Sequence, residues 1–271
     1  MSLYEQFLEY SRPKLDEYFK NANLFENQFQ YDDFNAACMV EMFETNHQDS
    51  IKTVKELKQS ILDLTPTCKK CGTYYMNPRN SSRKKLDVHL GRFLEDLIIE
   101  FLNDKLKLKA MHADNANKKY PDCMVLGTDK GILAYFEVKY HNAPFLTAIN
   151  KIGRYCYEGS ATLDLDKVIK QLELIESDLD RPVFYLHWID YPCLKGIFFE
   201  TSEQVKENLR LLENKESFER AEREGDFVEK STDNRKIGYT KKFYSNLLEM
   251  GTFEEFINIL NNLKKNGVKN Y

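Results

Sequence analysis

Long apolar segments are missing from this chain of 271 residues. No run of about 18 apolar residues occurs, so we expect no segment that spans a membrane. The first residues, MSLYEQFLEYSRPKLDEYF, mix charged and apolar side chains and lack the apolar centre of a signal peptide. We therefore expect a cytoplasmic protein in which the six cysteines are mostly free thiols.

An excess of positive charge is also missing. The 39 Lys and Arg residues are outnumbered by 43 Asp and Glu residues, which gives a net charge of −4. The molecule as a whole is not a polycation, so a nucleic-acid partner would have to meet a local basic surface. The sequence also lacks a GxGxxG or Walker-type loop and a Ser/His/Asp arrangement. These absences disfavour nucleotide cofactors and acyl transfer.

The periodicity of apolar residues predicts an α/β fold. A helix is expected over 89–106, because its apolar residues fall on one face. Short β-rich runs then predict strands over 107–112, 120–126 and 132–140. A further helix and two strands are expected over 163–177, 183–189 and 194–199. This order, α-β-β-β-α-β, indicates a mixed central sheet, with helical additions at both ends of the chain.

Composition divides the chain into three parts. Residues 1–85 are predicted to be a helical region, broken at Pro13, that ends in a polar loop containing the sequence CKKC. Residues 86–200 form the predicted core. Residues 201–271 are expected to be a charged, mostly helical extension.

The stretch YPDCMVLGTDKGILAYFEVKYHN, residues 120–142, places acidic residues at the ends of two strands. The sequence GTDKG between them predicts a hairpin turn. Because side chains alternate along a strand, Glu137 and Lys139 share one face, and the neighbouring strand can bring Asp122 beside them. Two carboxylates held together repel each other unless a cation binds between them. Their oxygens suit Mg²⁺, and a lysine beside it can position water or stabilise the charge that develops on a phosphate.

Pro121-Asp122 followed by Glu137-Val138-Lys139 resembles the signature of the PD-(D/E)XK nuclease superfamily, which includes many type II restriction endonucleases. The resemblance covers about residues 89–190. It implies a restriction-endonuclease-like core, with Asp122 and Glu137 as Mg²⁺ ligands and Lys139 as the catalytic lysine. It also implies that Mn²⁺ can substitute for Mg²⁺ and that double-stranded DNA is the substrate.

The same resemblance implies two auxiliary residues. Such nucleases often take another glutamate from the helix before the first strand, and the candidates here are Glu95 and Glu100. We choose Glu95 as a third metal ligand, because apolar residues flank it on the helical wheel whereas Glu100 faces solvent. Gln171 matches the place of a glutamine found on the later helix of some members. The tyrosine that follows it in the exonuclease branch is missing.

Basic and sulfur-containing residues outside this motif suggest two further sites. Lys118 and Lys119 directly precede Pro121-Asp122 and are expected to contact the phosphates of DNA. Cys68 and Cys71 have the spacing of half a zinc site. No second pair of that spacing exists, so free thiols in a basic loop are the alternative.

The sequence thus predicts a Mg²⁺-dependent endodeoxyribonuclease, with a type II restriction enzyme as the first hypothesis. An enzyme that cuts a palindrome would act as a homodimer, because its symmetry then matches that of its site. Two alternatives remain open. One is a repair or recombination nuclease that reads DNA structure, and the other is a binding module on a nuclease-like fold that cuts nothing.

Overall fold

The computed structural model describes residues 1–25, 84–114, 120–141, 161–190, 195–211, 217–219, 227–230, 233–236, 241–245 and 247–267. The core elements are α6 (Lys84–Asp104), β1 (Lys109–His112), β2 (Cys123–Leu126), β3 (Ile132–His141), α8 (Leu165–Ser177) and β5 (Val183–Asp190). Their order is α-β-β-β-α-β, so the predicted fold class is confirmed.

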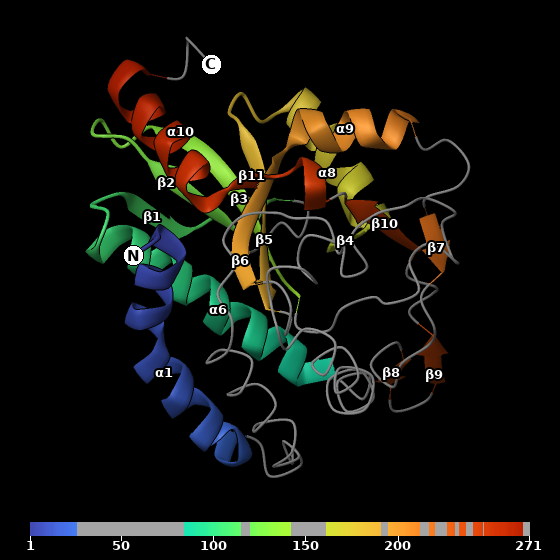
Figure 1. The fold of residues 1–271 in the computed structure, drawn as a ribbon. Coiled ribbons are helices and arrows are strands. Elements are labelled where there is room, and N and C mark those ends of the chain that lie inside the picture. Colours follow the sequence, from blue (N-terminus) through green and yellow to red (C-terminus); the bar gives the residue numbers. More distant parts are fainter. Residues whose placement is uncertain are drawn as a thin grey trace, which may run out of the picture.

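A mixed six-stranded sheet forms the centre of the fold (Figure 1). It is completed by β6 (Lys195–Thr201) and β11 (Gly251–Thr252), in the order β1-β2-β3-β5-β6-β11. β3 and β5 run parallel, whereas the other neighbouring pairs of this sheet are antiparallel. The connection between β3 and β5 passes through α8, as parallel neighbours require a crossover.

The predicted hairpin turn joins β2 to β3. The Gly127 amide donates to the Gly131 carbonyl at 2.7 Å, and the Asp129 carboxylate accepts from the Gly131 amide at 3.0 Å. Lys130 takes a left-handed conformation with φ 67°. The turn sets the register in which Cys123 lies opposite Phe136, and this register brings Asp122 close to the middle of β3.

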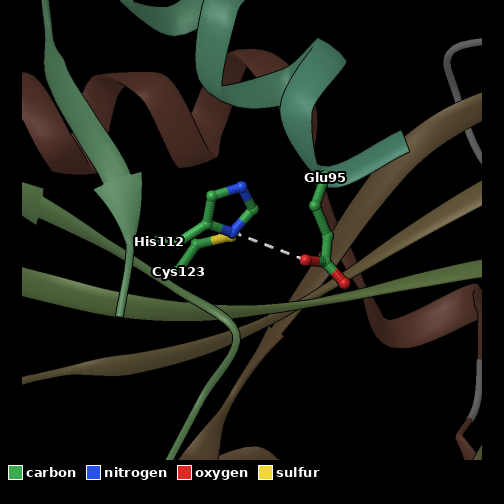
Figure 2. Close-up of side chains that lie close together, drawn as sticks. All are labelled: Glu95, His112 and Cys123. Carbon is green, nitrogen blue, oxygen red and sulfur yellow. Dashed lines mark ion pairs between the residues drawn. The ribbon is translucent and has the colours of Figure 1, made fainter. Parts of the chain in front are cut away.

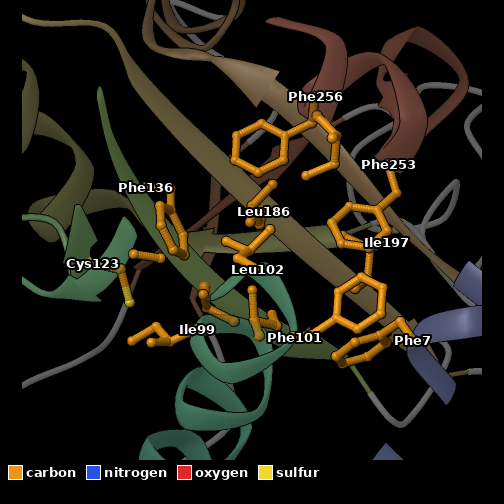
Figure 3. Packing of buried hydrophobic residues seen from close by; sticks show 14 of the residues in the cluster. Phe7, Ile99, Phe101, Leu102, Cys123, Phe136, Leu186, Ile197, Phe253 and Phe256 are labelled. Carbon is orange, nitrogen blue, oxygen red and sulfur yellow. The ribbon is translucent and has the colours of Figure 1, made fainter. Parts of the chain in front are cut away.

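One face of the sheet is covered by α1 (Leu3–Phe25), α6 and α10 (Phe253–Asn266). Their apolar side chains pack with those of β3 and β5 into the main hydrophobic cluster (Figure 3). Phe7 of α1 meets Trp188 of β5 edge to face, with ring centroids 4.8 Å apart. Full burial of a side chain of this kind stabilises the fold by about 1.5–3 kcal/mol.

Helix α1 continues through Pro13, so the expected break at that residue is wrong. A proline inside a helix removes one backbone hydrogen bond and usually bends or breaks the helix. Here Phe7, Leu8 and Leu15 lie on both sides of the proline and are all buried in the main cluster. Tertiary packing therefore outweighs the local preference.

The opposite face of the sheet is covered by α8 and α9 (Ser202–Leu211) and by a small three-stranded sheet. That sheet consists of β4 (Ala161–Asp164), β10 (Lys241–Ser245) and β7 (Ser217–Glu219). Strands β8 (Phe227–Lys230) and β9 (Asp233–Lys236) form a separate hairpin, and a 3₁₀ turn occupies Leu247–Glu249. The described part of residues 201–271 thus contains several short strands as well as helices.

None of the described helices combines the length and the apolarity that crossing a membrane requires.

Candidate functional site

Glu137 stands at the centre of a cluster of charged side chains on β3. Its side chain is only 1% exposed, and the Lys139 ammonium lies 2.7 Å from its Oε1 atom. Phe136 and Val138 point to the other face, into the main hydrophobic cluster. The structure therefore shows the alternation expected from the sequence.

Asp122 directly precedes β2 and reaches the same place from the neighbouring strand. Its Oδ2 atom accepts from the Val138 amide at 3.4 Å, and its backbone carbonyl accepts from the Ala113 amide at 3.0 Å. These bonds fix its position between β1 and β3. The side chain is 24% exposed, so the site can be reached from solvent.

Helix α8 supplies two more polar groups, four residues apart on one helix face. The Gln171 amide donates to Glu137 Oε2 at 3.0 Å and is itself buried. The Lys167 ammonium donates to Glu137 Oε1 and lies 3.5 Å from Asp122 Oδ1. Gln171 was a predicted site residue. Lys167 was not, although its position one helical turn before Gln171 places it on the same face.

The charges of this cluster shift one another's titration. Burial alone would raise the pKa of Glu137, but the positive charges of Lys139 and Lys167 lower it below its ordinary value. Burial would likewise lower the pKa of Lys139, but Glu137 and Asp122 raise it. Burial and the charge of Glu137 raise the pKa of Asp122. Lys139 is therefore a charged donor. The neighbouring lysines do not fully offset the effects of burial and of Glu137 on Asp122, so its ionised form stays disfavoured.

Glu95 lies on α6 and is largely buried, with a side-chain exposure of 15%. Its Oε2 atom is 3.6 Å from the Arg92 guanidinium and 3.5 Å from His112 Nδ1. Burial raises its pKa to about 7, and the charge of Asp122 adds to the shift. Glu100 on the same helix is 46% exposed and pairs with Lys14. Of the two glutamates considered from the sequence, Glu95 thus faces inward.

Glu95, His112 and Cys123 bring three different metal-ligating atoms together (Figure 2). These atoms all lie within 4.8 Å of one another, a spacing compatible with a divalent metal. Cys123 and His112 were not among the predicted site residues. The register that places them directly opposite each other on β2 and β1 cannot be read from local sequence.

A chain of hydrogen bonds, partly buried at His141 and buried beyond it, continues from the end of β3. His141 Nε2 lies 3.1 Å from His187 Nδ1, and His187 Nε2 lies 2.9 Å from Glu200 Oε1. The Ser245 hydroxyl donates to the same glutamate oxygen at 2.5 Å. Because the glutamate accepts, the neutral form of His187 would carry its proton on Nε2 and accept from His141 at Nδ1. This network fixes the side of the site next to Lys139.

Lys118, Lys119, Cys68 and Cys71 lie outside the described residues. Their predicted roles in binding DNA and zinc stay predictions.

No protein-family model matches the chain. No curated protein matches it either. Among solved structures, it is similar to one described as D212, a nuclease from a fusselovirus. The match covers 67% of this chain and 92% of that chain, with 12% sequence identity and a TM-score of 0.34. A TM-score this low does not show a shared activity.

Proposed function

We propose that this protein is a Mg²⁺-dependent endodeoxyribonuclease. The observation that carries the proposal is the position of Lys167. Its ammonium contacts Glu137 and lies 3.5 Å from Asp122, so a positive charge sits between two carboxylates from adjacent strands. A divalent cation that binds both carboxylates would take that place.

The donor set fits Mg²⁺. Asp122 and Glu137 offer only oxygens, which this hard cation prefers, and the partial exposure of Asp122 leaves room for water and a phosphate oxygen. Glu95 is proposed as the third carboxylate, since the charge of Asp122 already acts on it. When bound, Mg²⁺ polarises the phosphate and lowers the pKa of an attacking water. Mn²⁺ can replace it, because it accepts the same oxygen ligands.

Lys139 is proposed as the catalytic lysine. Its pKa is raised, so it acts as a charged hydrogen-bond donor. A donor held against Glu137 can orient the attacking water or stabilise the negative charge that develops on the phosphate. Gln171 holds Glu137 Oε2 in place and is proposed as a positioning residue.

The substrate is proposed to be double-stranded DNA, with Lys118 and Lys119 among its phosphate contacts. Within this class, a type II restriction enzyme remains our first hypothesis, acting as a homodimer if its site is a palindrome.

Digestion of a large, sequence-diverse DNA by the purified protein, with and without Mg²⁺, tests this proposal. Discrete fragments that form only with Mg²⁺ are expected, and their mapped ends would give the recognition site. A Mg²⁺-dependent smear would instead indicate a nuclease that reads DNA structure. DNA that stays intact with Mg²⁺ and with Mn²⁺, yet is shifted on a native gel, would overturn the proposal in favour of a binding module.

A further inference from the structure

His112 is held in one tautomer by its neighbour Asp96. The Nε2 atom lies 2.5 Å from Asp96 Oδ1, and a carboxylate can only accept, so Nε2 carries the proton. In a neutral imidazole the other nitrogen then presents a lone pair. That nitrogen, Nδ1, is buried and makes no hydrogen bond among the described residues. A buried acceptor without a donor is costly unless something binds it.

The lone pair of His112 Nδ1 points at two further metal ligands. Glu95 Oε2 is 3.5 Å away, and the Cys123 sulfur is within 4.8 Å of both atoms. Figure 2 shows the three side chains close together, with a dashed line for the ion pair between His112 and Glu95. Two ligands bound tetrahedrally to one zinc ion stand roughly 3.3–3.5 Å apart, given bond lengths of about 2.0–2.3 Å. The spacing between His112 and Glu95 already meets this requirement.

Three elements meet at this cluster. Glu95 comes from α6, His112 from β1 and Cys123 from β2. His112 and Cys123 are directly paired in the antiparallel ladder, so their side chains stand on the same sheet face. Cys123 is also paired with Phe136, which packs against α6, so this face is opposite to the one that carries Glu137.

We propose that Glu95, His112 and Cys123 form a second metal site, specific for a borderline transition metal of the Zn²⁺ class. Thiolate and imidazole ligands select such ions, whereas Mg²⁺ prefers oxygen alone. Binding forms a metal–sulfur bond and releases the thiol proton to solvent. Asp96 is the outer partner that orients the imidazole, an arrangement common around zinc. This site does not depend on the proposed nuclease activity.

The bound ion would tie α6 to β1 and β2 beside Asp122. It would also bind one oxygen of Glu95, which is proposed as a ligand of the Mg²⁺ site as well. A ligand that binds only the folded chain raises its free energy of unfolding with the logarithm of the ratio of free ligand to Kd. We therefore expect Zn²⁺ to raise the melting temperature of the stripped protein.

Titration with Co²⁺, an optical reporter for zinc sites, tests the proposal. The full-length chain is used with Cys68→Ser and Cys71→Ser, so that the CKKC loop cannot contribute a thiolate. About one Co²⁺ per chain should bind, with a thiolate-to-cobalt charge-transfer band that Zn²⁺ bleaches. Cys123→Ser should abolish the band, and Asp96→Asn should weaken binding about 10- to 100-fold. Asp122→Asn, the matched control from the other site, should keep the band.

Because Cys123 is fully buried, its serine variant can lose stability. His112→Gln is the second test, because His112 is partly exposed and its replacement should disturb the fold less. This variant should lose tight Co²⁺ binding and keep the far-ultraviolet circular dichroism of the parent protein. Absence of a thiolate band in the parent protein would overturn the proposal. So would a band that survives in folded Cys123→Ser or His112→Gln protein.

Discussion

At the scale of single residues, the proposed activity depends on Glu137 and the groups around it. An isolated buried carboxylate costs several kcal/mol, and here two ammonium groups and one amide offset that cost. Glu137 and these three partners alone would need no role beyond stabilising the fold. Asp122 does not stabilise this cluster, because burial and the charge of Glu137 both disfavour its ionised form. A cation that binds both carboxylates relieves this repulsion.

Lys167 gives the first prediction. Its ammonium occupies the place proposed for Mg²⁺, so Lys167→Met should raise the affinity of the protein for Mg²⁺. We expect an effect of about tenfold in Kd, equivalent to about 1.4 kcal/mol. Isothermal titration calorimetry with Mg²⁺ in the absence of DNA measures this directly.

Lys170→Met is the matched control for Lys167, because Lys170 lies on the exposed side of the same helix. Its affinity for Mg²⁺ should equal that of the wild type. Weaker Mg²⁺ binding by Lys167→Met would show that the lysine supports the metal site and does not compete with the ion.

His141 gives a prediction about pH. Burial lowers its pKa well below 6.5, and the neighbouring His187, Lys242 and Lys139 lower it further. Below pH 6.5 the unfolded chain therefore binds a proton that the folded chain excludes. The free energy of unfolding should fall as the pH drops through this range, by up to about 1.4 kcal/mol per pH unit.

Urea denaturation at pH 7.5 and pH 5.5 checks this effect. His141→Gln should lose less stability between the two pH values than the wild type, because it cannot take up the proton. His89→Gln removes an exposed histidine and should keep the acid sensitivity of the wild type. Equal sensitivity in all three proteins would contradict the assignment to His141.

The sequence could predict part of the cluster around Glu137 and not the rest. Asp122, Glu137 and Lys139 follow from a local motif and from the alternation of a strand. Gln171 could be placed because α8 begins close to where the periodicity indicates. Lys167 was missed, since a lysine on a helix is usually solvated. His112 was missed because its contact with Cys123 depends on register between strands that are ten residues apart in the sequence.

At the scale of elements, α10 illustrates a helix whose start is determined locally. The Thr252 hydroxyl accepts from the Glu255 amide at 3.3 Å, and the Glu255 carboxylate accepts from the Thr252 amide at 2.7 Å. This reciprocal capping box satisfies two backbone donors at the helix end. The helix then buries Phe253, Phe256 and Leu260 against the sheet.

Thr252→Ala should destabilise the protein by about 1 kcal/mol, because it leaves the Glu255 amide without its cap. Chemical denaturation of the two proteins measures the difference. Thr252→Ser keeps the hydroxyl and should retain most of the wild-type stability. An alanine variant as stable as the serine variant would mean that the cap contributes nothing.

Elements that depend on distant partners were harder to predict. Residues 163–177 were expected to be one helix, but residues 161–164 form β4 and the helix begins at Leu165. β4 exists because it pairs with β10, about 80 residues further along the chain. A four-residue strand of this kind gives little local signal, since its stability comes from the non-local partner.

At the scale of the whole molecule, the mixed sheet separates two environments. Its one face packs against α1, α6 and α10 in an apolar core, and its other face carries Glu137, Lys139, His187 and Glu200. The crossover through α8 brings Lys167 and Gln171 over that second face. The order of elements was predictable from periodicity, and it is this order that places the residues of the motif in one cluster.

The proposed cleavage of DNA by this cluster is tested most directly by the rate of Mg²⁺-dependent cleavage by Lys139→Met protein. The fold should survive, because Lys167 and Gln171 still pair with Glu137. We predict a loss of at least about 100-fold in rate. The variant should lose some stability but stay folded at the assay temperature, as circular dichroism would show. Lys109→Met, which removes an exposed lysine from β1, should cleave like the wild type. Cleavage at the wild-type rate by folded Lys139→Met protein would contradict the account.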